Sequence, residues 1–440
     1  MKVPRAGSIF NESRPMISTL ALVLIGLILF GLLIIDNINK GVIKPVGAAP
    51  PLPTRNALSY SQEGQAYFDS GDLDKAIAAY QEGLAVDPEN VTVLTELARL
   101  QTYSASLLTP ERKKERLLEA LDNINLAVEL DDFDSDAHAV RAFVLNWNAG
   151  QAQSADERDQ LLTESSKAAN KAILLDVQNA LAIAYRAETL ADQLQIAQAL
   201  QAARIAISLE PNLMDTHRVY AYVLESTAEY SEAIREYKIA AEIMPNLTFL
   251  YISIGLNYRQ LNLYNEALEY FDRAATINSN LGIKDPLPYI AIGKTYSRQG
   301  EFFIAARNVE RALEFDPTNP DIYGQLGVIR FRARNYEGSI PVFACAVEGC
   351  VVYEDPIQGI MIPENDEDRE EMAGLPAITV PGLALTNESV VYYYTYGSVL
   401  AALKQCEKAL PILNLVQEQY ANDDLIMSII QESFFICSAE

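Results

Sequence analysis

Four cysteines carry the most specific chemistry that this sequence offers. They lie together in the last quarter of the 440 residues, at Cys345, Cys350, Cys406 and Cys437. Thiolates can bind zinc, but the chain has no Cys-x-x-Cys pair and only 2 histidines, so we expect no metal site. The cysteines are then either small buried residues in a reducing compartment or disulfides outside it. Their even number and close spacing favour disulfides.

A run of carboxylates in the segment Glu354–Ser389 is the second group with possible chemistry. Most of these carboxylates lie between residues 364 and 371, and a dense carboxylate cluster can bind a divalent cation. However, the spacing of a Ca²⁺ loop with its central glycine is absent. We therefore expect a solvated acidic loop rather than a metal site, followed by an extended stretch at Leu375–Leu383.

Catalytic motifs are missing from the sequence. There is no P-loop, Gly-x-Gly-x-x-Gly, His-Glu-x-x-His or Gly-x-Ser-x-Gly segment, and acid–base catalysis would depend on carboxylates. The formal net charge of −25 repels nucleic acid. We expect a protein that is not an enzyme, that needs no cofactor or small-molecule substrate, and that does not bind nucleic acid.

The sequence repeats itself with a period of about 34 residues, and the fold of this repeat sets where the groups described above lie. Pro211 and Pro245 are 34 residues apart, and so are Tyr230 and Tyr264. Self-similarity at this period is typical of stacked helix pairs, in which each pair buries its apolar face against its neighbours. Such a chain usually offers a long surface to a partner.

The residues inside each period resemble the tetratricopeptide repeat. In that pattern aromatic, large apolar and small residues alternate at fixed spacings, and a proline closes the unit. Small residues let the paired helices approach each other, and the proline ends one unit before the next begins. The clearest match is Tyr289, Ile292, Gly293, Tyr296, Ala305, Val309, Ala312 and Pro317. The resemblance implies an all-α fold, a right-handed α-solenoid of helix pairs.

Nine such repeats organise the chain. We expect them to begin at Ala57, Val91, Ser135, Ala180, Met214, Thr248, Pro286, Pro320 and Val390. A terminal cap should cover the apolar face that the last repeat leaves open. The expected segments are a tail (1–14), a transmembrane helix (15–36), a Pro-rich linker (37–56), repeats one to eight (57–353), an acidic insertion (354–389), repeat nine (390–421) and a capping helix (422–440).

An uncharged segment near the N-terminus predicts a membrane anchor. As a helix, Met16–Ile35 would be about 30 Å long, which matches the hydrocarbon core of a bilayer. A cleaved signal peptide is the alternative, but its apolar part is normally shorter. The flanking basic residues balance and do not settle the orientation. The short tail and the cysteines favour a single-pass protein of the cell membrane, with a cytoplasmic N-terminus and the repeats outside.

The resemblance also implies where a partner would bind. In such repeats the first helix of each pair lines a concave groove, and several matching positions in repeats five to eight are basic. A basic patch in an acidic protein would attract an acidic or C-terminal peptide, although scattered surface charge is the alternative. The Lys/Asn clamp of chaperone-binding repeats is not reproduced. The candidate groove residues are Arg218, Tyr222, Arg259, Lys294, Arg298, Phe331 and Arg332.

An array of helix pairs further predicts how the cysteines pair. Cys406 lies in the turn between the two helices of repeat nine, and Cys437 lies at the far end of the cap. Because successive first helices run side by side, the end of the cap should approach that turn closely enough for a disulfide. Cys345 and Cys350 lie at a helix end, where a local bridge is possible.

The sequence thus predicts a membrane-anchored scaffold that binds a protein or peptide through its groove or its insertion. The alternative is a fixed structural subunit of a larger envelope, secretion or cell-surface assembly, which would use the convex face, the insertion and the cap. A partner held by groove charges should dissociate in high salt, whereas a structural subunit should keep its partner.

Overall fold

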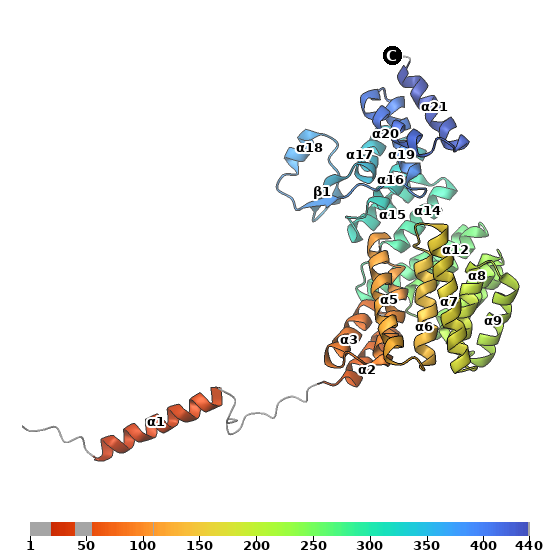
Figure 1. The fold of residues 1–440 in the computed structure, drawn as a ribbon. Coiled ribbons are helices and arrows are strands. Elements are labelled where there is room, and N and C mark those ends of the chain that lie inside the picture. The colour runs from red at the N-terminus through yellow and green to blue at the C-terminus, as the bar shows by residue number, and fades with distance from the viewer. Residues whose placement is uncertain (1–18, 40–54, 109, 439–440) are drawn as a thin grey trace, which may run out of the picture. The chain divides into compact units, whose positions relative to one another are not determined.

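The computed structural model describes residues 19–39, 55–108 and 110–438 (Figure 1). It divides the chain into two compact units, Met1–Arg55 and Asn56–Glu440. In the first unit, helix α1 covers Thr19–Asn39, and its side chains are described at residues 21–35. The predicted tail and most of the predicted Pro-rich linker lie outside the described residues.

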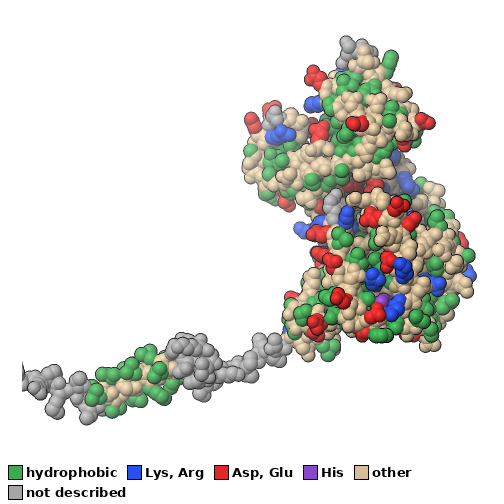
Figure 2. Space-filling view, viewed as in Figure 1, with side chains coloured by type: hydrophobic (Ala, Val, Ile, Leu, Met, Phe, Trp, Pro, Cys, Tyr) green, Lys and Arg blue, Asp and Glu red, His purple; other side chains and the backbone are tan. Residues whose placement is uncertain are grey.

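The structure does not show the predicted transmembrane helix. Among the side chains that it describes, no helix is both long enough and apolar enough to cross a membrane. The apolar side chains of the described part of α1 are exposed, as Figure 2 shows, with Leu27 and Phe30 each 62% accessible. Residues 15–18 of the predicted span lie outside the described part of the chain.

The second unit is a solenoid of antiparallel helix pairs (Figure 1). Within each pair the first helix packs along the second, and each second helix also packs against the first helix of the next pair. The pairs are α2 (Ala57–Asp69) and α3 (Leu73–Val86), α4 (Val91–Ala105) and α5 (Pro110–Leu130), α6 (Ser135–Ala149) and α7 (Ala155–Leu175), α8 (Ala180–Asp192) and α9 (Ile196–Leu209), α10 (Met214–Ser226) and α11 (Tyr230–Ile243), α12 (Thr248–Gln260) and α13 (Tyr264–Leu281), α14 (Leu287–Gln299) and α15 (Phe302–Phe315), α16 (Pro320–Arg332) and α17 (Tyr336–Val347), and α19 (Val390–Ala402) and α20 (Cys406–Gln419).

Local sequence signals set these helices and their contacts. Asn90, Asn179 and Asn319 each cap the helix that follows, because the side-chain oxygen accepts a hydrogen bond from a free N–H of the first turn. Small residues then bring paired helices together. At Gly255 of α12 an added Cβ atom would lie 2.4 Å from the ring of Phe271 on α13, so only glycine fits there.

Repeats two to six form a closed turn of the solenoid. Arg99 of α4 places a guanidinium nitrogen 3.2 Å from a carboxylate oxygen of Asp215 on α10. The ring of Tyr103, also on α4, stacks on that of Phe249 on α12 with 5.3 Å between the ring centres. Repeat two therefore contacts repeats five and six directly, and one continuous core joins these repeats.

The insertion contains an ordered sheet and a short helix where we expected an acidic loop, and most of its described acidic side chains are exposed as expected. Strands β1 (Cys350–Asp355), β2 (Gly359–Met361) and β3 (Ala377–Val380) pair antiparallel in the order β2-β1-β3. Val352 and Val380 are buried in the core of repeats seven and eight, which ties the sheet to the solenoid. The short helix α18 (Asp366–Glu371) carries the acidic cluster, and the extended conformation expected for Leu375–Leu383 is present in β3.

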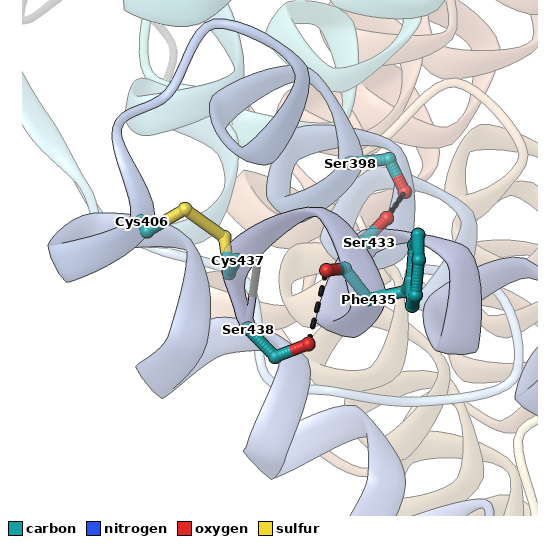
Figure 3. Close-up of a disulfide and its surroundings, with 6 residues drawn as sticks. All are labelled: Ser398, Cys406, Ser433, Phe435, Cys437 and Ser438. Carbon is teal, nitrogen blue, oxygen red and sulfur yellow. Dashed lines mark hydrogen bonds between the residues drawn. A yellow bond between two sulfur atoms is a disulfide. The ribbon is translucent and has the colours of Figure 1, made fainter. Parts of the chain in front are cut away.

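The cysteines pair as the sequence predicts. Cys406, the first residue of α20, is bonded to Cys437 near the end of the final helix α21 (Asp424–Ser438), with 5.5 Å between their Cα atoms (Figure 3). Beside this bond, Ser433 of α21 donates a hydrogen bond to Ser398 of α19. Cys345 and Cys350 form the second disulfide, which links the end of α17 to the start of β1.

Candidate functional site

The candidate groove residues all lie on first helices, but the structure separates them into two groups. Arg218 and Tyr222 belong to α10, inside the closed turn. The other five lie on α12, which is the last first helix of that turn, and on α14 and α16 beyond it. The two groups differ in burial and in the partners of their charges.

Arg218 and Tyr222 line a separate pocket, and their polar groups are already paired within the protein. Arg218 is only 5% exposed, and its Nη2 lies 2.6 Å from Oε2 of Glu188 on α8. The Arg218 guanidinium also lies over the rings of Tyr103 and Phe143. Closure of the solenoid causes the difference, because it turns this part of the concave face into core.

Tyr222 is likewise committed to an internal contact. Its hydroxyl donates to Asp192 on α8 at 2.5 Å, and Asn146 on α6 donates to the same carboxylate at 2.7 Å. Burial raises the pKa of Asp192, and these two hydrogen bonds oppose that shift. The partners Glu188 and Asp192 were missed in the sequence, although each lies 30 residues before its partner on the next first helix.

A cavity of about 500 Å³ remains inside the closed turn. Trp147 and Phe249 line it, and the Trp147 indole N–H donates to Glu188 at 3.0 Å. Because Glu188 is already bonded to Arg218, both acceptor oxygens of this carboxylate are engaged. Its wall therefore contains charges that are already paired with each other, together with aromatic rings.

The second group forms a concave site on the C-terminal repeats, which we call the basic pocket. It has a volume of about 270 Å³. Apolar and polar side chains from α14, α16 and α19 complete its wall, namely Ser297, Gln325, Val328, Ile329, Val391 and Tyr392. Its four cations are Arg259, Lys294, Arg298 and Arg332.

Phe331, the remaining candidate, does not line this pocket. Its side chain is 36% exposed, and its ring packs against Tyr336 with 5.7 Å between the ring centres. Phe331 precedes Arg332 in α16 and so faces a different side of that helix. It is therefore a contact between the helices of repeat eight and not a wall of the pocket.

The cations of the basic pocket lack acidic partners among the described residues. None of them has a carboxylate oxygen within 4 Å. The nearby carboxylate of Asp321 is already occupied, because the Tyr392 hydroxyl donates to one oxygen at 2.6 Å and the Gln325 amide donates to the other. The pocket therefore holds a concentration of positive charge that the protein itself does not neutralise.

This unneutralised charge affects the ionisation of the pocket. Burial, together with the charge of Arg298, lowers the pKa of Arg259 to about 10. Lys294 is exposed over its side chain as a whole, but desolvation by the pocket walls still lowers the pKa of its ammonium. The attraction of Asp321 opposes that shift and the charge of Arg259 adds to it. Both groups would thus be stabilised by a bound anion.

The helix pairs and their concave face define the class of an α-solenoid repeat protein. Within that class, family models of the tetratricopeptide repeat match residues 64–101, 250–281 and 290–349. The chain therefore contains tetratricopeptide repeats, a fold suited to protein–protein interaction. The comparison with curated proteins finds no match.

Solved structures with similar folds include other tetratricopeptide repeat proteins. The crystal structure of yeast Tom70 is 17% identical with a TM-score of 0.44, over 96% of this chain and 79% of that one. A thermophilic TPR protein of Thermus thermophilus is 18% identical with a TM-score of 0.38, over 46% and 98%. Human IFIT1, solved as a dimer with PPP-AAAA, is 15% identical with a TM-score of 0.44, over 66% and 71%. At these values the likenesses carry no information on partners.

Proposed function

We propose that this chain is a non-catalytic, membrane-anchored scaffold that binds a protein or peptide on the concave face of its repeats six to nine. The basic pocket is the observation that carries the proposal, because four cations without acidic partners lie there in a protein of net charge −25. An acidic segment of a partner would find at this site the charge that the rest of the surface lacks.

The division of the solenoid supports the choice of this face. Helices α4, α6, α8, α10 and α12 direct side chains into the closed turn, where Asp215 binds Arg99 and both Tyr103 and Tyr185. A partner there would meet charges that are already paired within the protein. On α14 and α16 the cations Lys294, Arg298 and Arg332 are exposed and have no ion pair to break among the described residues.

The anchor is the second part of the proposal. Side chains such as Leu27 and Phe30 of α1 are more than half exposed, and water is an unfavourable surrounding for a helix that is apolar on all sides. A bilayer would remove this cost. Two disulfides favour an oxidising compartment for the repeats, which gives a cytoplasmic N-terminus in a single-pass protein of the cell membrane.

A structural subunit of a larger assembly is the alternative function. Large apolar side chains are exposed on the insertion and on the final helix, namely Ile357 at 95%, Phe435 at 73% and Leu425 at 71%. Exposed apolar groups at the end of a repeat array are possible sites for a permanent contact. Such a contact would be insensitive to salt and would not involve the basic pocket.

Reversal of the pocket charge tests the proposal. Full-length protein in a nonionic detergent is used to select binders from a library of displayed peptides, and the selected peptides are measured on R259E/K294E/R298E. The triple variant should lose at least tenfold in affinity while keeping its helical circular dichroism. A variant with the same change of net charge at exposed positions outside the pocket, K114E/R334E/K408E, is the matched control. Equal binding by both variants would contradict the proposal.

A further inference from the structure

The basic pocket differs from every other place where the described solenoid buries an arginine in a polar contact. Arg99 has Glu96 and Asp215 as carboxylate partners, and Arg218 has Glu188. The half-buried Arg330 has Glu310. Each arginine that the described solenoid buries fully, Arg99 and Arg218, therefore has a carboxylate partner from the protein.

Arg259 departs from this pattern. Its guanidinium is partly buried, and its Nη1 is a buried atom with no hydrogen-bond partner in the described structure. Arg298 repels it from the neighbouring helix α14, and its ring contact with Phe271 supplies no acceptor. A buried donor without an acceptor has lost its hydration without compensation, and the cost is larger for a charged group. An external acceptor would recover this cost.

We infer that the basic pocket binds an oxyanion that carries two or more negative charges, contributed by the partner as a phosphate group or as adjacent carboxylates. The inference rests on the proposed function and names the chemical group that the pocket recognises. Lys294 and the three arginines offer several N–H donors each, arranged around a volume of about 270 Å³. Such a volume accepts a phosphate or the ends of two acidic side chains.

The number of charges favours a polyvalent group over a single carboxylate. A single carboxylate would leave three of the four cations without a counter-charge in a partly desolvated site. A phosphate carries about −1.5 to −2 charges near neutral pH and presents three acceptor oxygens, so it can bond to several of these donors at once. Two adjacent carboxylates supply the same charge with four oxygens.

Calorimetry with inorganic phosphate and pyrophosphate on the full-length protein tests this inference. Chloride at equal ionic strength measures the screening effect alone. Three peptides of equal length follow, with a phosphoserine, an Asp-Asp pair or a single Asp among glycines. R259Q/K294Q/R298Q should weaken phosphate binding at least tenfold, whereas K114Q/R334Q/K408Q should leave it unchanged.

Proton uptake gives a readout that simple charge screening would not produce. Arg259, Arg298 and Arg332 surround Lys294, and Asp321 and Tyr392 are the other ionisable groups at the pocket. A bound oxyanion should raise the pKa of Lys294, so binding at alkaline pH should take up protons. The heat of binding should then depend on the ionisation enthalpy of the buffer, and K294M should reduce this dependence.

The outcomes separate the inference from the proposed function. Tighter binding of the phosphoserine or the Asp-Asp peptide supports the inference and identifies the source of the charge. If the single-Asp peptide binds as tightly as the other two peptides, the inference is overturned. It is also overturned if phosphate has no larger effect than chloride. Either result holds even if the charge-reversed variant loses its selected peptides. Phosphate binding without any loss of selected peptides in that variant would overturn the proposed function instead.

Discussion

Burial and pairing decide the role of each charge along the concave face. Arg218 and Arg259 stand on consecutive first helices, yet the first is bonded to Glu188 and the second has a free buried nitrogen. The sequence marks both as basic groove positions, because it reports the residue type and the helix face. It does not report that Glu188 completes one site and that nothing acidic completes the other.

A buried carboxylate outside the pocket gives a test at the residue scale. Asp285 is 3% exposed, and burial raises its pKa to about 6, against the opposing hydrogen bonds from the Leu287 N–H and the Asn278 amide. The folded state therefore holds this proton more tightly than the unfolded state, whose pKa is near 3.8. The contribution of Asp285 to the free energy of unfolding therefore falls as the pH rises from about 4 to 6, and it stays lower at higher pH.

The substitution Asp285→Asn should remove this pH dependence. The amide keeps an acceptor for Leu287, and its N–H₂ can donate to the Asn278 oxygen, which has no partner at present. The variant should gain stability relative to the parent between pH 5 and pH 7, by an amount on the order of 1 kcal/mol. Urea unfolding of both proteins at the two pH values measures it, and a constant difference would refute the argument.

Close approach between distant repeats is the feature that matters most at the scale of elements. The turn after α2 contains Gly71 with a φ of +85°, and a Cβ atom there would lie 2.3 Å from the carbonyl oxygen of Asn246, before α12. This contact brings repeat one against the junction of repeats five and six. The sequence shows the glycine at position 71, but it does not show that the Asn246 carbonyl packs against it.

Gly71→Ala should therefore destabilise the protein more than Gly282→Ala does. Gly282 also has a positive φ, of +70°, but no atom lies within 4 Å of an added Cβ there. Gly282→Ala should cost roughly 1 kcal/mol of backbone strain, and Gly71→Ala about 1–3 kcal/mol more because backbone must move. Thermal unfolding of the two variants gives the comparison. Equal losses would mean that the closed turn is looser than described.

The disulfide at the chain end is the second test at this scale. The bond between Cys406 and Cys437 closes a sequence separation of 31 residues and fixes α21 to the last repeat. C406S/C437S should lose about 3–4 kcal/mol in the chain-entropy account, and hydrogen exchange in α21 should accelerate because array ends fray first. C345S/C350S is the control, since it should leave α21 unchanged. Unaltered exchange of α21 in the first variant would reject this role.

At the scale of the whole molecule, the sequence predicts the solenoid but not its closure. A period near 34 residues and the small residues of each unit are local signals, so the helix pairs follow from them. Closure depends on small rotations that accumulate over several repeats, which no single repeat encodes. The insertion was misjudged for a related reason, because β1 finds its partner β3 only across the intervening acidic segment.

Membrane attachment is a prediction for the whole chain. The protein expressed in cells should stay in the membrane pellet after carbonate extraction and should keep its N-terminal residues. Two lysines at the centre of α1, in L24K/I28K, should release it, since each charge at mid-membrane costs about 2.5–3.5 kcal/mol. The conservative variant L24I/I28L should behave like the parent. Release of the parent protein by carbonate would contradict the proposed anchor, and so would a mature N-terminus near Ala49.

Hydrogen exchange of the full-length protein with and without a selected peptide tests the central claim most directly, because it locates the contact without altering a residue. We predict that the bound peptide slows amide exchange in α12, α14 and α16, whose side chains contribute to the basic pocket. Exchange in α4, α8 and α10 of the closed turn should not change. Protection confined to the sheet at residues 350–380 or to α21, with α14 and α16 unchanged, would contradict it and favour the structural subunit.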